Sequence, residues 1–459
     1  MSSKPADRPR PPSVERLLAR VRERLDRPSE AAAVLAVARD VVDAERQRLL
    51  DDPTPPDLDA LAAAVVDRLD GFAGPTEAAP PAVINATGVI VHTNLGRAPW
   101  PLAVAEAAMA DSTGYGLLEM DRETGRRGAR ARIAEDHLVA LTGADDALVT
   151  NNNAAALALA VGLTGRGGIV VSRGELVEIG GGVRIPDIIR RAGAKLIEVG
   201  TTNRTRASDF EAPLEEGRAR AVLRVHPSNF TMSGFVETPD TGAVAELAHR
   251  HGAIVIDDLG SGALLDTSAY GLTHEPLPAE RLAAGSDVVT FSGDKLVGGP
   301  QAGLVVGRAD LIARMRRDPL ARAMRPDKVT MAAVALTLGL YRAGRALTDI
   351  PVWRMISTPV EALRTRADRL RDRLGDAVEI VDLRSTVGGG SLPGETLLSV
   401  GLAIVGSSPT RRLAGLRRGT PPVIGRIEDD RVVLDLRTVD PASDDDLASA
   451  IERALGNSR

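Results

Sequence analysis

Apolar residues recur at helical spacing through the first part of the chain. The segment Val14–Leu25 places one every three or four positions, directly after a serine that can cap a helix. Similar patterns run over Glu30–Leu50 and Leu58–Leu69, with prolines between them. The Pro- and Gly-containing stretch 71–82 that follows is typical of a linker. The pattern therefore predicts an N-terminal helical domain and linker over residues 1–80.

Short apolar segments alternate with helical patterns over residues 81–340. Helices such as Ala154–Leu163 and Thr241–Arg250 are predicted between strands. This alternation predicts an α/β domain with a mainly parallel, seven-stranded sheet covered on both faces. Binding sites in such sheets lie at the carboxyl ends of the strands. The predicted strands are Ala147–Thr150, Ile169–Ser172, Leu196–Val199, Ala221–Val225, Ala253–Ile256, Val288–Phe291 and Gly303–Gly307.

The last region, residues 341–459, mixes the helical and strand periodicities. It has a long helical pattern at Val360–Leu374 and a final one at Asp444–Leu455. Between them come short strands, a Gly-rich turn and a hairpin predicted from Val423–Ile427 and Val432–Leu436. We therefore predict a small α+β C-terminal domain.

Composition excludes several kinds of chemistry. The chain has no cysteine, so disulfides, thiolate metal sites and a cysteine nucleophile are ruled out. Its six histidines lack HExxH-type spacing, which argues against a catalytic zinc. The net charge of -5 argues against indiscriminate binding to nucleic acid, although it allows a local basic patch. A charged N-terminus and the lack of a long apolar run predict a cytoplasmic protein without signal peptide or membrane span.

A lysine and two aspartates stand near the ends of two consecutive predicted strands. Asp257 and Asp258 follow one strand, and Lys295 follows the next in the glycine-rich stretch TFSGDKLVGGPQAG. Taken alone, such a lysine is usually a solvated surface residue, and such an aspartate is often a helix cap. Together they suit pyridoxal phosphate (PLP), which needs a lysine for its imine and a carboxylate beside its ring nitrogen. We predict a PLP enzyme with Lys295 and Asp257, and with Asp258 as the alternate carboxylate.

The stretch LVTNNNAAALALAVG, residues 148–162, joins a strand to a helix through three asparagines. The N–H groups at a helix N-terminus bind phosphate well. Asn152, Asn153 and Ala154 are therefore our candidates for the cofactor phosphate, with Ser292 as a further one. The simpler alternative is an asparagine that only caps the helix.

Three arginines could hold an anion near these segments. Arg97 follows a glycine in HTNLGRAPW, while Arg322 and Arg325 stand three residues apart in DPLARAMRPDK. That spacing predicts one helical face, from which two guanidinium groups can hold an oxyanion. The alternative is that all three form surface salt bridges. The basic segment RRGARAR, residues 126–132, is more typical of a solvated face than of an RNA contact.

Longer motifs carry a family resemblance. They include INATGVIVHTNLGRAP, GYGLLEMDRETGRRG, SRGELVEIGGGVRIPDI, RVHPSNF, DDLGSG, TFSGDKLVGGPQAG and PPVIGRIEDDRVVLDLRTV. Through them nearly the whole chain resembles the bacterial selenocysteine synthases, the L-seryl-tRNA(Sec) selenium transferases. The resemblance implies the PLP-dependent transferase fold (aspartate aminotransferase-like, type I). It also implies a homo-oligomer in which dimers assemble into a decamer, with active sites at dimer interfaces.

The resemblance also implies roles for individual residues. Lys295 matches the PLP lysine, and Asp294 matches a carboxylate at the reaction centre. The N-terminal helical domain would select the tRNA. The residue that stacks on the cofactor ring stays unassigned, with His226 as a candidate. The arginines implied for the phosphate-like group of the selenium donor are Arg97, Arg322 and Arg325.

These features predict conversion of L-seryl-tRNA(Sec) to L-selenocysteinyl-tRNA(Sec). The route is PLP-dependent β-elimination of water, followed by selenium addition from selenophosphate. One alternative is a PLP lyase acting on a small amino acid or amino sugar, but such relatives would be expected to lack the helical domain. A second is a non-catalytic RNA-binding protein on a degenerate enzyme fold, and the intact Lys295 and Asp257 count against it.

Overall fold

The structure is a computed structural model that describes residues 9–26, 29–73, 82–127, 132–180 and 182–456. It divides into two compact units, residues 1–83 and 84–459, and each is described by itself. Most of the predicted linker and the middle of the basic segment 126–132 lie outside the described residues. None of the described helices is both long and apolar enough to cross a bilayer.

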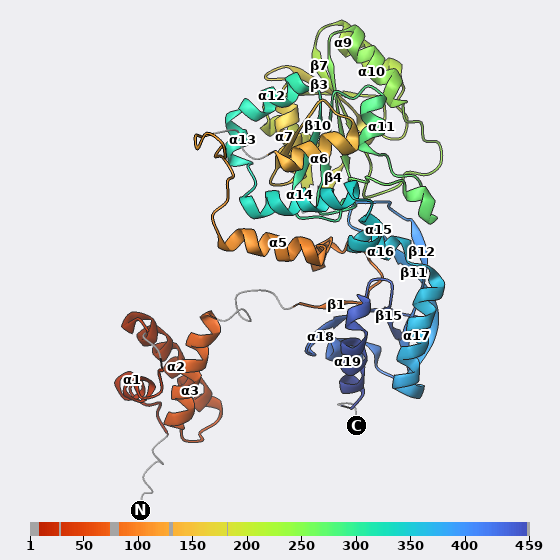
Figure 1. Cartoon of the computed structure of the whole chain (residues 1–459). Coiled ribbons are helices and arrows are strands. Elements are labelled where there is room, and N and C mark those ends of the chain that lie inside the picture. Colours follow the sequence, from red (N-terminus) through yellow and green to blue (C-terminus); the bar gives the residue numbers. More distant parts are fainter. Residues whose placement is uncertain (1–8, 27–28, 74–81, 128–131, 181, 457–459) are drawn as a thin grey trace, which may run out of the picture. The chain divides into compact units, whose positions relative to one another are not determined.

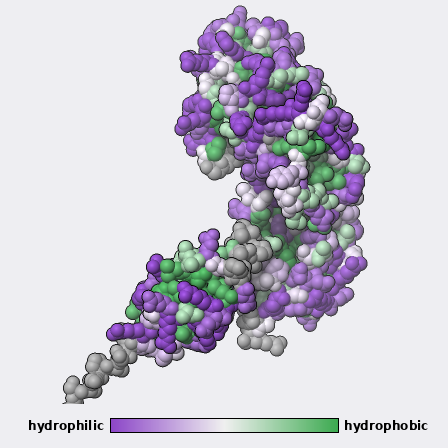
Figure 2. Space-filling model, turned by 60° about the vertical axis from the view of Figure 1, so that its left-hand side comes forward, coloured by the Kyte–Doolittle hydropathy of each residue, from purple (hydrophilic) through white to green (hydrophobic). Residues whose placement is uncertain are grey.

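The described residues of the first unit form three helices, as the apolar pattern predicts (Figure 1). The hydroxyl of Ser13 accepts a hydrogen bond from the backbone N–H of Arg16 and caps the first helix. The three helices share an apolar core, to which each contributes buried side chains such as Leu17, Val41 and Val65. Figure 2 shows some apolar side chains also reaching the surface of this unit. The helices are α1 (Val14–Arg22), α2 (Ala31–Asp51) and α3 (Leu58–Ala73).

A seven-stranded sheet forms the centre of the second unit, and every strand predicted for it is present. One strand, β10, runs antiparallel to both of its neighbours, and all other neighbours are parallel. The predicted mainly parallel sheet is therefore confirmed. In spatial order the strands are β2 (Asp146–Thr150), β10 (Gly303–Gly307), β9 (Val288–Ser292), β8 (Ile254–Gly260), β7 (Ala219–Val225), β3 (Gly168–Ser172) and β6 (Lys195–Val199).

Helices pack on both faces of this sheet (Figure 1). One face is covered by α7 (Asn153–Gly162), α8 (Ile185–Arg191) and α12 (Ala309–Arg317). The other face is covered by α6 (Ile133–Thr142), α10 (Thr241–Arg250) and α14 (Lys328–Arg342). Because helices cover both faces of the sheet and exclude water, the strands consist of nearly continuous apolar runs and not of alternating apolar and polar residues.

One strand differs from its prediction in a way that matters for the site. The predicted strand Ala253–Ile256 stops before the acidic pair, whereas β8 continues to Gly260. Asp257 and Asp258 therefore lie within the sheet, and both are buried. Since neighbouring residues of a strand point to opposite faces, the two carboxylates have different surroundings.

A second, antiparallel sheet forms the C-terminal part, in the order β11 (Val378–Thr386), β12 (Thr396–Ile404), β15 (Arg431–Asp435) and β14 (Arg426–Glu428). The prediction of short strands before the hairpin was wrong, because β11 and β12 have nine residues each. The hairpin itself is confirmed only for β14 and β15. Its predicted first residues instead form β13 (Val423–Ile424), which takes β1 (Ile84–Asn85) as a parallel partner. Helices α17 (Val360–Leu374), α18 (Pro409–Arg417) and α19 (Asp444–Gly456) pack against the sheet.

Candidate active site

Lys295 lies in the turn after β9, and its side chain is buried among residues from distant parts of the chain. Only 8% of the residue is exposed, and burial lowers the pKa of its amine. The one hydrogen bond that its Nζ donates to a described residue is long, 3.4 Å to the carbonyl oxygen of Gly390. A buried, weakly bonded amine with a lowered pKa is suited to imine formation and proton transfer.

Two glycines allow the chain to approach this amine closely. A Cβ atom at Gly390 would lie 2.8 Å from Nζ of Lys295, and one at Gly260 would lie 3.8 Å from it. Both glycines have positive φ values, 78° and 68°, which other residues rarely adopt. The hydroxyl of Ser228 would lie 3.2 Å from the same Cβ at Gly260. The Gly-rich turn of the C-terminal region therefore forms one wall of the lysine site, a role the sequence pattern did not reveal.

Asp258 is the aspartate of β8 that faces the lysine side of the sheet. Its Oδ1 accepts hydrogen bonds from Nδ2 of Asn153 at 2.8 Å and from the hydroxyl of Thr290 at 2.9 Å. No described residue donates to its other oxygen, Oδ2. Burial raises the pKa of Asp258, while its negative charge raises the pKa of Lys295 against the effect of burial.

Asp257, the predicted cofactor carboxylate, points to the opposite face of β8. The hydroxyl of Ser286 donates to its Oδ2 at 3.4 Å, and Nε of Arg281 lies 3.7 Å from that oxygen. Burial raises the pKa of Asp257 as well. These contacts give Asp257 no link to Lys295, so the geometry favours the alternate, Asp258.

The N-terminus of α7 contacts Asp258 through Asn153, the first residue of the helix. The side chain of Asn152 caps the helix by accepting from the N–H of Ala155 at 2.9 Å, as in the simpler alternative. No described residue accepts from the backbone N–H groups of Asn153 and Ala154. The buried side-chain Oδ1 of Asn153 also has no hydrogen-bond partner among the described residues. Free donors at a helix N-terminus suit a phosphate group.

Arg97 and Asp294 form an ion pair next to Lys295. Nη1 of Arg97 donates to Oδ2 of Asp294 at 2.6 Å, and the hydroxyl of Ser292 donates to Oδ1 at 2.6 Å. Ser292 is thus directed to Asp294, not to the α7 terminus. Arg97 has a φ of 65° and follows Gly96 with a φ of 90°. A left-handed arginine costs on the order of 1 kcal/mol, which the fold tolerates at a position that holds Asp294.

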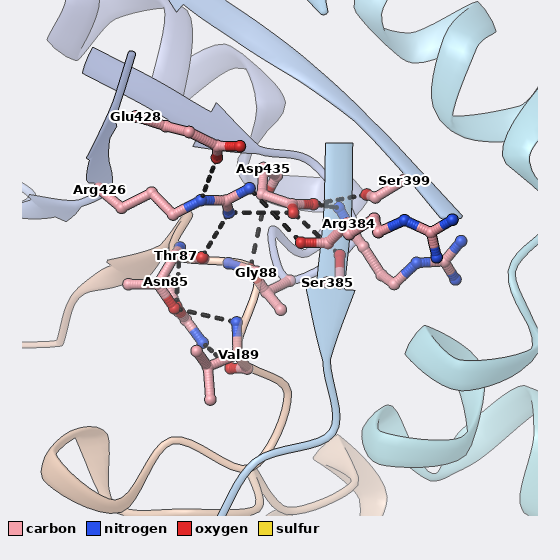
Figure 3. A network of polar contacts seen from close by, with 12 residues as sticks. Asn85, Thr87, Gly88, Val89, Arg384, Ser385, Ser399, Arg426, Glu428 and Asp435 are labelled. Carbon is pink, nitrogen blue, oxygen red and sulfur yellow. Dashed lines mark hydrogen bonds and ion pairs between the residues drawn. The ribbon is translucent and has the colours of Figure 1, made fainter. Parts of the chain in front are cut away.

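A network of polar contacts fixes the strand segment that leads to Arg97 (Figure 3). Nη1 of Arg426 donates to the carbonyl oxygen of Thr87 at 2.6 Å and to Oδ2 of Asp435 at 3.2 Å. Two serine hydroxyls also donate to the fully buried carboxylate of Asp435. Gly88 has a φ of 77°, and a Cβ there would collide with Asp435. The C-terminal sheet therefore sets the path of the segment that carries Arg97.

The structure does not bring Arg322 and Arg325 to this ion pair. Their predicted shared helical face was wrong, because α13 (Pro319–Ala323) ends before Arg325. Pro326 disfavours helical backbone at the preceding residue, which explains this end. Arg325 instead forms an ion pair with Glu119 at 2.9 Å. Within the described part of the chain, neither arginine has a hydrogen bond or ion pair with Asp294 or Asp258.

A histidine and a buried glutamate also lie near the lysine. Nε2 of His226 is 3.3 Å from Oε1 of Glu275, and Glu275 is 2% exposed. The charge of Glu275 raises the pKa of Lys295, although less than that of Asp258 does. The backbone N–H of His226 donates to the carbonyl oxygen of Asp258 at 2.9 Å. The sequence suggested His226, but Glu275 lies in a loop without a recognisable motif.

Comparison with known sequences matches most of the chain to one family. The sequence profile of the family SelA, described as L-seryl-tRNA selenium transferase, matches residues 83–440. A protein named L-seryl-tRNA(Sec) selenium transferase from Hyphomonas neptunium is 47% identical over 81% of each chain. A relative of the same name from Moorella thermoacetica is 42% identical, and the match covers 97% of this chain and 96% of the relative.

Comparison with solved structures concerns the fold. The structure of D-glucosaminate-6-phosphate ammonia-lyase has a TM-score of 0.59 and 19% sequence identity, and it covers 83% of this chain and 98% of its own. At this identity the likeness shows the fold alone. Together with the order of the seven strands, it confirms the predicted type I α/β fold.

Proposed function

Because this chain belongs to the L-seryl-tRNA selenium transferase family, we propose that it converts L-seryl-tRNA(Sec) to L-selenocysteinyl-tRNA(Sec). Water is eliminated from the seryl group, the selenium of selenophosphate then adds to the β-carbon, and cleavage of the Se–P bond by water releases inorganic phosphate. The cofactor is pyridoxal phosphate. The observation that carries the proposal is the buried amine of Lys295 between Asp258, the N-terminus of α7 and the Arg97–Asp294 pair.

The residues around Lys295 fit this cofactor. When bound, pyridoxal phosphate supplies an aldehyde carbon that takes up an amine and a ring that delocalises the charge of an α-carbanion. Lys295 would hold it covalently. Asp258 would accept from the ring nitrogen through Oδ2, which receives no hydrogen bond from a described residue. The N–H groups of Asn153 and Ala154 would bind its phosphate.

Lys295 and Asp294 would share the proton transfers. The lowered pKa of the Lys295 amine increases the neutral fraction that can remove the α-proton of the seryl group. Asp294 is the neighbouring residue, and it would bring a proton to the departing hydroxyl. Arg97 would bind the anionic group of the selenium donor through its guanidinium and neutralise charge there.

The other partners follow from the same family. We place the protein in the cytoplasm, where its tRNA substrate is found, with residues 1–80 selecting the tRNA. We expect dimers assembled into a decamer. Arg322 and Arg325 are exposed. They would serve the selenium donor at an active site on a dimer interface.

The test is turnover of seryl-tRNA(Sec) with selenophosphate, with seryl-tRNA(Ser) as the control substrate. We expect product only from seryl-tRNA(Sec), and we expect Lys295→Ala to lose both turnover and the visible absorbance of the bound cofactor. Normal turnover by Lys295→Ala would refute the role of this lysine. Turnover of a free amino acid or amino sugar without tRNA would instead support the lyase alternative.

A further inference from the structure

The C-terminal part of the chain carries a basic surface that the chemistry at Lys295 does not use. Residues 396–427 contain five arginines and neither aspartate nor glutamate, although the whole chain has a net charge of -5. Four of these arginines, two at each end, belong to α18 or directly follow it: Arg411, Arg412, Arg417 and Arg418. Such a concentration of one charge needs an explanation other than overall composition.

Packing of α18 does not explain its arginines. The helix contacts the C-terminal core through Leu413 and Leu416, while two of its arginines and the one that directly follows it are exposed to solvent. They form no hydrogen bond or ion pair with any described residue through their side chains. The exposed arginines are Arg411, Arg417 and Arg418.

Helix α17 of the same unit shows the usual arrangement. Its Arg364 pairs with Asp382, its Arg371 pairs with Asp372, and its other ion-paired arginines also have acidic partners. Four of the five arginines of α17 are therefore paired with acids, and Arg369 alone has no such partner among the described residues. The unpaired set on α18 leaves its full charge available to an external anion.

A groove of about 1040 Å³ lies between α18 and α19. Arg411 and Arg418 line it, and Arg417 is next to Arg418 but outside the lining. None of the described residues that line it is acidic. Arg412 and Arg453 are held at the groove by backbone carbonyl groups at 2.9 and 2.8 Å. Arg411 and Arg418 have no such bonds, and they are separated by about 10 Å along the helix axis. They can therefore reach separate anionic groups of one extended ligand.

We infer that this groove binds the sugar–phosphate backbone of the tRNA substrate. The inference rests on the proposed function, because that function supplies the polyanion. A chain of phosphates matches several arginines along a wide groove, and guanidinium groups bind phosphate oxygens with two donors at once. Backbone contacts carry no base information. The groove therefore adds affinity for any tRNA and leaves the choice of tRNA to other parts of the protein.

The test uses the full-length holoenzyme with Arg411, Arg417 and Arg418 all replaced by Gln. The dissociation constant for tRNA(Sec) is measured by fluorescence anisotropy at several salt concentrations. Three lost phosphate contacts should reduce the slope of log affinity against log salt by about 2. The affinity at low salt should fall at least roughly tenfold. We expect the same loss with tRNA(Ser), an increase in KM for seryl-tRNA(Sec) and an unchanged kcat.

A matched control removes the same charge from paired arginines of the same unit, through Arg364→Gln, Arg371→Gln and Arg431→Gln. Each of these arginines already has an acidic partner, so none of them is available to a phosphate group. The control should therefore leave the slope of log affinity against log salt nearly unchanged. A wild-type slope in the α18 variant, or an equal loss in the control, would overturn the inference. If the wild type and the α18 variant differ in slope as expected but the wild type makes no selenocysteinyl-tRNA, the proposed function is refuted while the inferred tRNA binding at the groove is supported.

Discussion

The two faces of β8 present neighbouring aspartates with nearly the same burial and very different surroundings. Asp257 is 1% exposed and Asp258 is 4% exposed, and burial raises the pKa of both carboxyl groups. On one face, Asp258 accepts hydrogen bonds from the neutral side chains of Asn153 and Thr290 and interacts electrostatically with Lys295. On the other face, Asp257 lies near the cation of Arg281, in a part of the sheet that packs against α10 and α11 (Pro278–Ala283).

This difference shows that burial and a raised pKa do not identify a functional carboxylate by themselves. A buried ion pair, Arg224 with Glu175 at 2.9 Å, lies near Asp257. The two charges of this pair neutralise each other within the fold. Near Asp258, by contrast, the amine of Lys295 donates only one long hydrogen bond. The first two backbone N–H groups of α7 and the Oδ1 of Asn153 have no hydrogen-bond partner among the described residues. Unsatisfied groups that converge from several elements mark the face that receives a ligand.

The largest effect is expected from Asp258→Asn. Loss of an ion pair to a protonated ring nitrogen at about 4 Å removes roughly 4 kcal/mol at an effective dielectric near 20, or about a thousandfold in rate. Asp257→Asn makes the same chemical change at the neighbouring residue and should lower kcat less than tenfold. Steady-state turnover of seryl-tRNA(Sec) and the cofactor absorbance spectrum measure both variants. A larger loss in Asp257→Asn would restore the first sequence prediction.

The sequence predicted which strands and turns carry the site better than it predicted which face of β8 the site lies on. The strands and the position of Lys295 after one of them were predictable, because apolar runs mark the strand ends. The pairing of Arg97 with Asp294 was not predicted. Which aspartate faces the lysine was not predictable from the strand pattern. The predicted strand stopped before the pair, and alternation alone gives opposite faces without saying which face holds α7.

Residues that reach the lysine from far along the chain were harder still. Gly390 comes from the C-terminal part of the chain, whereas Ser228 and Glu275 come from loops that follow β7 and β8. Their local sequences resemble ordinary turns and loops. The error for Arg325 has a local cause, since Pro326 ends the helix that the i,i+3 spacing assumed.

A smaller contrast between the faces is expected from single hydroxyl groups. Thr290→Val keeps the shape of the side chain but removes a 2.9 Å hydrogen bond to Asp258, which should lower kcat about tenfold. Ser286→Ala removes only the 3.4 Å contact with Asp257, and kcat should stay within about twofold of the wild type. Turnover at saturating substrate measures both. Equal losses would mean that the two faces of β8 contribute alike, against our assignment.

The smallest effect concerns the pH dependence of stability. A carboxyl group whose pKa is raised by folding stabilises the fold below its unfolded pKa, near 4, and this contribution is lost as pH rises through the folded pKa. Asparagine has no such dependence. In the cofactor-free protein, both Asp257→Asn and Asp258→Asn should therefore gain Tm relative to the wild type as the pH rises above about 4. About 1 kcal/mol would correspond to roughly 2 °C.

Cofactor should separate the two variants, because only one carboxylate would face its ring. A protonated ring nitrogen beside Asp258 lowers the pKa of that carboxyl and makes its charged form favourable. The Tm gain of Asp258→Asn at high pH should then vanish or reverse when pyridoxal phosphate is added, while the gain of Asp257→Asn stays the same. Thermal unfolding followed by circular dichroism, with and without cofactor, measures this difference. If cofactor instead removes the gain of Asp257→Asn, the ring nitrogen faces the other side of β8, and the roles assigned to the two aspartates must be exchanged.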